Sequence, residues 1–80
     1  HDLYRAAGGF DLIFANILKG PLVDLAPDVA RNLRPGGHVI LSGLLIDQSK
    51  EVDNAYRGQG LVPISSRTLG EWATLTLKLP

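Results

Sequence analysis

The segment His38–Leu45 is the feature that most restricts the fold of this chain. It reads HVILSGLL, and from Val39 onward only Ser42 and Gly43 interrupt the apolar residues. The run is far shorter than the roughly 20 apolar residues that span a bilayer. A nearly continuous apolar strand is typical of a parallel sheet whose two faces are both covered. The run therefore predicts an α/β fold and not a membrane protein.

A strand and a helix are predicted before this segment. Phe10–Ala15 is a short run of aromatic and branched apolar residues, which indicates a buried strand. Gly20-Pro21 indicates the start of a helix, because proline has no N–H and loses nothing at the first helical position. Apolar residues then follow at helical spacing and form one stripe: Leu22, Leu25, Ala26, Val29 and Leu33.

Prolines and glycines predict where this helix is disturbed and where it ends. Pro27 lies inside the apolar pattern, and because proline removes a backbone hydrogen bond we expect a kink or a restart there. Pro35-Gly36-Gly37 is expected to end the helix as a turn before the strand that follows.

A second helix and two further strands complete the pattern. Asp47–Gln59 is polar except for one helical face, made of Val52, Ala55 and Tyr56. Leu61–Arg67 indicates a third strand. Trp72–Leu79 alternates strictly between apolar and polar residues, which suits an antiparallel strand paired with its neighbour. On the sequence alone, a strand tryptophan such as Trp72 is interpreted as a packing residue.

The order strand, helix, strand, helix, strand, strand predicts half of a doubly wound sheet. Helical crossovers make the first three strands parallel, with right-handed connections. We expect Trp72–Leu77 to run antiparallel between Val39–Leu44 and Leu61–Ser66. The chain begins His-Asp and has no methionine, so we expect it to be a piece of a longer protein.

The composition excludes several kinds of function. Eight basic and eight acidic residues give a net charge of zero, so direct nucleic acid binding through a basic face is not expected. Cysteine is absent and there are only two histidines, so no metal site is expected. Neither Gly8-Gly9 nor Ser42-Gly43 fits a phosphate loop or a nucleophile motif, and Ser42 is interpreted as a small strand residue.

Asn16 is the candidate binding residue. It follows the first predicted strand, and ligands of open α/β sheets bind beyond the carboxyl ends of the strands. Its amide offers both a donor and acceptors, which can fix a polar ligand or an amine. Asparagine is also a common turn residue, so a local cap remains the alternative from the residues alone.

Four segments carry a resemblance to a known family. They read FDLIFANILKGPL, LRPGGHVILSGLL, AYRGQGL and GEWATL, and together they cover about Phe10 to Leu79. The chain resembles the C-terminal half of a class I S-adenosylmethionine-dependent methyltransferase. More narrowly, it is similar to the bacterial family that methylates ribosomal protein L-eleven.

The resemblance implies a Rossmann-like sheet of seven strands in the order 3-2-1-4-5-7-6, of which this chain has three parallel strands, one antiparallel strand and two crossover helices. Residues 1–80 would form a partial catalytic domain that lacks the glycine-rich half. S-adenosylmethionine is the implied cofactor, with Asn16 and Ile17 beside it, and a ribosomal protein is the implied partner in the cytoplasm. Ile17 and Leu18 stand where related enzymes have two prolines.

The implied function is transfer of methyl groups to amino groups of that ribosomal protein. No residue here looks like a dedicated general base, so the catalytic residues stay open. A methyltransferase acting on another protein or a small molecule, a non-catalytic interaction module and a nicotinamide-dependent oxidoreductase are the alternatives. The isolated chain is expected to be inactive.

Overall fold

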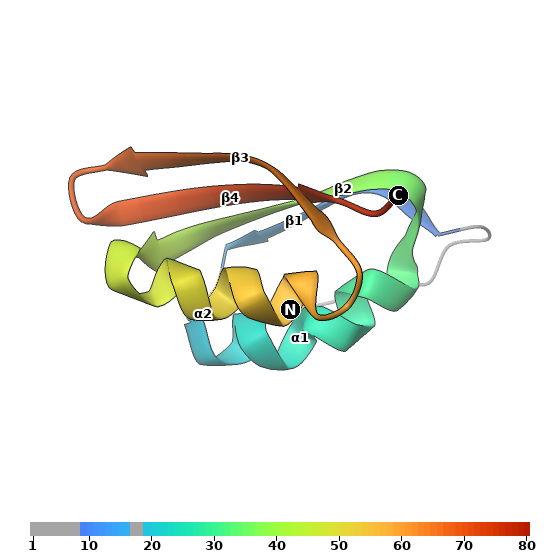
Figure 1. The fold of residues 1–80 in the computed structure, drawn as a ribbon, viewed down its shortest axis with the longest axis horizontal. Helices are drawn as coiled ribbons and strands as arrows, with labels where there is room; N and C mark the ends of the chain where they lie inside the picture. The colour runs from blue at the N-terminus through green and yellow to red at the C-terminus, as the bar shows by residue number, and fades with distance from the viewer. Residues whose placement is uncertain (1–8, 17–18) are drawn as a thin grey trace.

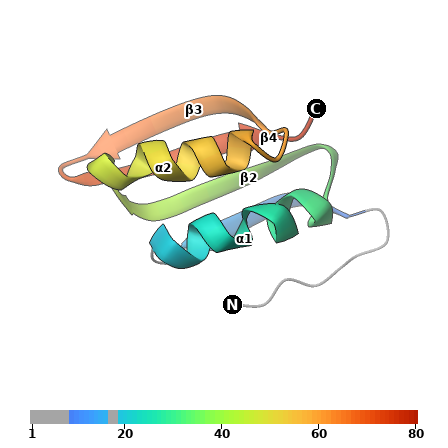
Figure 2. The same ribbon diagram turned by 60° about the horizontal axis from the view of Figure 1, so that its bottom comes forward.

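A computed structural model describes residues 9–16 and 19–80 of the chain. Its elements, in chain order, are β1 (Phe10–Asn16), α1 (Lys19–Asn32), β2 (Leu33–Leu45), α2 (Ile46–Arg57), β3 (Val62–Leu69) and β4 (Trp72–Lys78). Both helices lie on the same face of the sheet (Figures 1 and 2). Within the described residues, the other face carries no helix. The order of strands and helices along the chain is the order predicted from the sequence.

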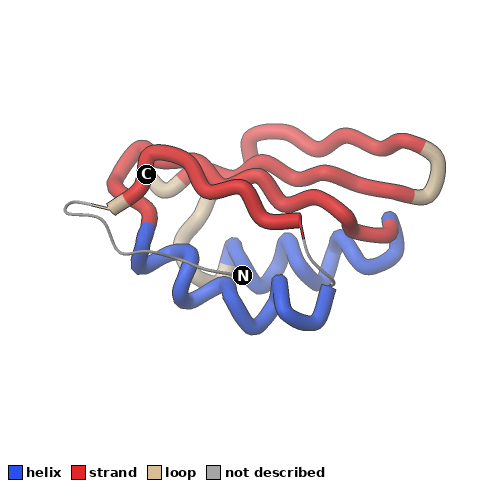
Figure 3. Tube along the Cα trace, turned by 180° about the vertical axis from the view of Figure 1, so that it is seen from behind, coloured by secondary structure: helices blue, strands red, loops and turns tan. Residues whose placement is uncertain are grey.

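The strands form one mixed sheet in the order β1-β2-β4-β3. β1 pairs with β2 in parallel, and β4 pairs antiparallel with both β2 and β3. β1, β2 and β3 consequently point the same way, and the last strand lies between β2 and β3 as expected from the sequence (Figure 1). Seen from behind, the strands form one layer and the helices form another (Figure 3). Both crossovers advance in one direction across the sheet, which explains why both helices cover the same face.

The core lies between the helices and the inner face of the sheet. Alternate strand residues point into it: Ile13 of β1, Val39 and Leu41 of β2, and Ala73, Leu75 and Leu77 of β4 are all buried. Of the apolar stripe predicted for the first helix, Leu22, Leu25, Ala26 and Val29 are buried in α1, and so are Val52 and Tyr56 of α2. Leu33 is buried too, but it is the first residue of β2 and not part of the helix. Burial of these side chains is the main force holding the two layers together.

The Pro35-Gly36-Gly37 segment corrects one prediction. It does not end the helix, because α1 ends at Asn32 and the three residues lie inside β2. The Gly36 N–H donates to the Leu79 carbonyl at 2.6 Å, and the Leu79 N–H donates to the Gly37 carbonyl at 2.9 Å. These hydrogen bonds keep the segment in the sheet, as a bulge between the pairs Phe10–Leu33 and Leu12–His38.

Pro27 does not make the helix restart. α1 runs without interruption from Lys19 to Asn32. Pro27 lies on the exposed side of α1, so water can hydrogen bond to the Val23 carbonyl that loses its helical partner. Because water can replace this lost hydrogen bond, α1 continues through Pro27 without a break.

Trp72 corrects a second expectation, since it is not a core residue. Its side chain is 55 % exposed. The strict alternation of β4 places Ala73, Leu75 and Leu77 against the helices and Trp72 on the opposite face. Trp72 pairs with Leu45 at the end of β2 and with Leu69 at the end of β3. It thus lies at the carboxyl edge of the parallel strands.

Candidate functional site

Asn16 and Ser42 are neighbours at the carboxyl edge of the sheet. Asn16 is the last residue of β1, and the parallel register pairs it with Ser42 of β2. Ser42 comes only three residues before the end of β2 at Leu45. Ligands of open α/β sheets bind outside this edge, so the structure places two polar side chains of adjacent strands where a ligand is expected.

A β-bulge lies directly beside this pair. The register of β2 and β4 passes from Leu41–Leu75 to Leu44–Ala73, so β2 has one more residue than its partner over this stretch. Gly43 has a φ of 77°, a left-handed conformation that glycine adopts without strain. Bulges bend a strand and are frequent next to active sites. The Ser-Gly pair, interpreted from the sequence only as a small strand residue and its neighbour, is the signal for this bulge.

Both side chains lie on the sheet face that α1 and α2 leave uncovered. Ile13 and Leu41 are buried under the helices, and strict alternation therefore turns Asn16 and Ser42 to the other face. Asn16 is exposed and Ser42 is partly buried. Neither side chain makes a hydrogen bond to another residue in the part of the chain that the structure describes. Their polar groups are thus accessible.

The other residue predicted to bind the cofactor is Ile17. It lies outside the described residues, so its position relative to Asn16 stays a prediction. Gly8 also lies outside the described residues. No group of three or more His, Asp or Glu side chains within residues 9–16 and 19–80 could hold a metal ion. Over the same residues, neither helix has the length and apolar character needed to cross a membrane.

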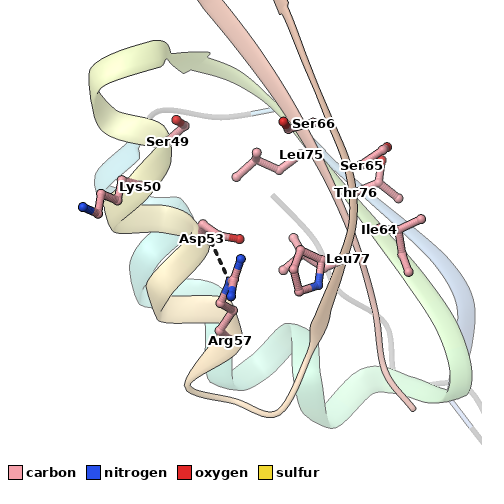
Figure 4. A pocket seen from close by; sticks show the side chains of 11 residues that line it. Ser49, Lys50, Asp53, Arg57, Ile64, Ser65, Ser66, Leu75, Thr76 and Leu77 are labelled. Carbon is pink, nitrogen blue, oxygen red and sulfur yellow. Dashed lines mark hydrogen bonds and ion pairs between the residues drawn. The ribbon is translucent and has the colours of Figure 1, made fainter.

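A groove of about 420 Å³ lies elsewhere, between α2 and the strands β3 and β4 (Figure 4). Leu75 and Leu77 are among its apolar lining residues, and an ion pair crosses its helical wall from Arg57 Nε to Asp53 Oδ2 at 2.8 Å. Asn16 does not line this groove, because β1 is at the opposite edge of the sheet from β3. The groove and the Asn16–Ser42 pair are therefore separate features.

Tyr56 is a buried titratable group that belongs to the core and not to the carboxyl edge. Its hydroxyl donates a hydrogen bond of 2.8 Å to the carbonyl of Leu22, which joins α2 to α1. Burial raises the pKa of Tyr56 from 10.0 to about 12, because the phenolate would be poorly solvated there. This shift is explained by the packing of the two helices, so it does not indicate a catalytic base.

The fold is that of a methyltransferase. A crystal structure of a methyltransferase from Pyrococcus furiosus superposes on 91 % of this chain with a TM-score of 0.70 and 24 % identity. A crystal structure of ribosomal protein L11 methylase from Lactobacillus delbrueckii subsp. bulgaricus covers the same share with a TM-score of 0.85 and 33 % identity. The chain corresponds to 42 % and 38 % of those two structures.

The particular family follows from the sequence. The family model described as ribosomal protein L11 methyltransferase (PrmA) matches residues 2–80, so the chain belongs to this family. Curated members include those of Bradyrhizobium diazoefficiens, 49 % identical over 75 residues, and Chelativorans sp., 45 % identical over 78 residues. These matches cover 94 % and 98 % of this chain but only 25 % and 27 % of the relatives. The chain thus spans about a quarter of their length.

Proposed function

We propose that this chain is part of a longer enzyme, the parent protein, which transfers methyl groups from S-adenosylmethionine to amino groups of ribosomal protein L11. The match of residues 2–80 to the family supports this proposal. The observation that carries the site is the accessible amide of Asn16 at the carboxyl end of β1, paired with Ser42 of β2. An enzyme that modifies a ribosomal protein works where ribosomes assemble, so the cytoplasm is its proposed location.

The four strands fit one half of a seven-stranded methyltransferase sheet. In the order 3-2-1-4-5-7-6, β1 and β2 would be the fourth and fifth strands, while β3 and β4 would be the sixth and seventh. The observed order β1-β2-β4-β3 has this arrangement. The free edge of β1 would then adjoin the first strand, and Asn16 would lie at the point where the strand order reverses, which is where ligands bind.

The residues of this chain fit one wall of a cofactor site. The Asn16 amide can donate through its nitrogen and accept through its oxygen, which suits a polar cofactor or an incoming amine. Ile17 is proposed to provide apolar contact beside it. A glycine-rich loop between a strand and a helix and an acid for the ribose are missing from this sequence. The rest of the parent protein would have to supply them.

The chemistry of methyl transfer requires little from these residues beyond positioning. When bound, S-adenosylmethionine would supply an electrophilic methyl group and a neutral thioether as the leaving group. Asn16 would hold the amine nitrogen in line with that methyl group. The amine would first give up a proton to solvent, since neither β1 nor β2 has an acid or a histidine at its carboxyl end. Orientation can lower such barriers substantially.

A chimera tests the proposal. This chain would replace the corresponding quarter of the Bradyrhizobium diazoefficiens relative, and methyl transfer to purified ribosomal protein L11 would be measured. We expect the chimera to be active and Asn16→Ala to lower its kcat/KM by roughly 5- to 100-fold, because a lost hydrogen bond to a polar or charged group costs about 1–3 kcal/mol. Asn54→Ala, on the exposed side of α2, is the matched control and should leave the rate unchanged.

Two outcomes would contradict this function. A folded chimera that is inactive on ribosomal protein L11 but binds a different substrate would favour another methyltransferase. A folded chimera that binds no cofactor at all would favour an interaction module. If Asn16→Ala lowers the melting temperature but leaves the rate per folded molecule normal, Asn16 is a structural cap and not a binding residue.

A further inference from the structure

We propose that Ser42 binds the amine to be methylated, as a second hydrogen-bond acceptor beside Asn16. This inference rests on the proposed function and assigns the substrate side of the same site. The starting observation is the register, which pairs Asn16 of β1 with Ser42 of β2 at the carboxyl edge. The sequence alone gives Ser42 no such partner, because 26 positions separate the two residues along the chain.

The spacing of the two residues suits one nitrogen atom. Adjacent strands lie roughly 4.8 Å apart, and side chains of paired residues on one face have a similar separation. Two oxygens at that separation can both accept from a single nitrogen at about 2.9 Å each, with roughly the tetrahedral angle between them. A neutral primary amine would then use its two N–H bonds on Ser42 Oγ and Asn16 Oδ1. Its lone pair would remain free to form the new bond.

The bulge gives Ser42 a fixed and accessible position. Gly43, with its φ of 77°, makes the extra residue of β2 immediately after Ser42. Leu41 before it and Leu44 after it are both fully buried, so they anchor the strand on each side of the bulge. Ser42 itself is only partly buried and faces away from the helices. The packed neighbours therefore fix the position of the Ser42 hydroxyl, which is not itself buried in the core.

The hydrogen bonding of polar side chains supports the same inference. Some hydroxyl and amide side chains of the chain satisfy local backbone groups: Ser49 donates to the Ile46 carbonyl at 2.7 Å, and Asn32 donates to the Asp28 carbonyl at 2.7 Å. Among the described residues, Ser42 and Asn16 form no side-chain hydrogen bond of this kind. Two such groups side by side at a ligand-binding edge suit an external partner that can donate twice.

The test uses the chimera with Ser42→Ala, Ser42→Thr and Ser65→Ala. Ser65 is the matched control, because it lies on the same sheet face but on β3, at the other edge. We expect Ser42→Ala to lower kcat/KM for ribosomal protein L11 roughly 3- to 10-fold, as for one lost neutral hydrogen bond. Affinity for that protein without cofactor should weaken in the same direction. Ser42→Thr keeps the hydroxyl and should recover most of the loss, and Ser65→Ala should change nothing.

Cofactor affinity and stability separate this role from a structural one. Titration with S-adenosylmethionine and the melting temperature should be the same for Ser42→Ala and the unmodified chimera. A loss of cofactor affinity, a fall in melting temperature that accounts for the rate, or an unchanged kcat/KM would each overturn the inference. If Asn16→Ala is impaired while Ser42→Ala is normal, only the role of Ser42 fails. If the unmodified chimera neither binds nor methylates ribosomal protein L11, the proposed function fails and this role falls with it.

Discussion

Tyr56 shows how one side chain joins the two helices. Its ring is fully buried, and its hydroxyl donates to the Leu22 carbonyl across a sequence separation of 34 residues. A phenol buried without a partner would lose its hydrogen bonds to water, so this contact offsets the cost of burying the oxygen. The helical spacing of Val52 and Tyr56 predicts the buried face of α2. It does not predict the partner on α1.

Tyr56→Phe should lower the free energy of unfolding by about 1 kcal/mol at neutral pH, the usual net value of one such hydrogen bond. The folded-state pKa is raised to about 12 from 10.0, so the phenol stabilises the fold fully below pH 10. Between pH 10 and 12 the unfolded chain ionises at this residue while the folded chain does not, so the free energy of unfolding falls by roughly 1.4 kcal/mol per pH unit. Urea unfolding at pH 8, 10 and 11.5 measures both effects.

The Phe variant is its own control for the alkaline range, because it has no phenol at this position. Its stability should fall less steeply above pH 10 than that of the unmodified chain. Parallel curves for the two proteins would mean that Tyr56 titrates normally.

Residue type alone predicts the wrong environment for Trp72 and gives Ser42 no binding role. A tryptophan in a strand is usually packed, yet the alternation of β4 assigns the helix-facing positions to Ala73, Leu75 and Leu77. The alternation was visible in the sequence, but which face the helices cover was not. Ser42 gains its importance from its register with Asn16, and register between distant strands is set by tertiary packing.

At the scale of elements, Gly37 decides how the chain passes from α1 into the sheet. A Cβ at this position would lie 2.8 Å from the Phe10 carbonyl oxygen and 2.9 Å from that of Arg34. Both contacts are with backbone, which cannot move aside without disturbing β1 and β2. Only glycine therefore allows the bulge that brings Leu33 beside Phe10 and His38 beside Leu12.

Gly37→Ala should cost roughly 1–3 kcal/mol of folding free energy, as expected for a forced steric overlap in a packed region. Gly58→Ala is the matched control. Gly58 ends α2 with φ −62° and ψ −20°, and a Cβ there would meet its nearest atom at an ordinary 3.4 Å. This substitution should be neutral or stabilising by up to about 1 kcal/mol, since alanine loses less backbone entropy than glycine.

Thermal or urea unfolding of the two variants measures the difference directly. Equal stability of Gly37→Ala and Gly58→Ala would show that the bulge relaxes to admit a side chain. In that case the close backbone approach does not determine the geometry of the crossover.

The predictions at Pro27 and at Pro35-Gly36-Gly37 were wrong for a common reason. Proline and glycine mark departures from regular backbone, and they do not say which element contains the departure. Pro35-Gly36-Gly37 looks like a turn, but hydrogen bonds with Leu79, more than 40 residues later, keep it in β2. Pro27 looks like a break, but exposure to solvent lets α1 continue through it.

At the scale of the whole molecule, one face of the sheet exposes large apolar side chains. The helices cover the inner face, while Leu12 and Phe14 of β1 are 55 % and 63 % exposed on the other. Continuous apolar strands such as β2 are typical of sheets covered on both faces. The order of the elements could be predicted because each pattern is local. The extent of the site could not, because the chain spans only a quarter of its curated relatives.

The isolated chain should not bind S-adenosylmethionine with useful affinity. A dissociation constant of 1 μM needs about 8 kcal/mol of binding free energy. One hydrogen-bonding group such as Asn16 contributes on the order of 1–3 kcal/mol. A pocket normally encloses 70–90 % of its ligand, whereas these residues form a single wall. Calorimetric titration of the 80-residue chain, with its folding checked by circular dichroism, should give no saturable heat where the chimera does. Micromolar, saturable binding to the chain alone would show that β1 and β2 carry most of the cofactor site themselves.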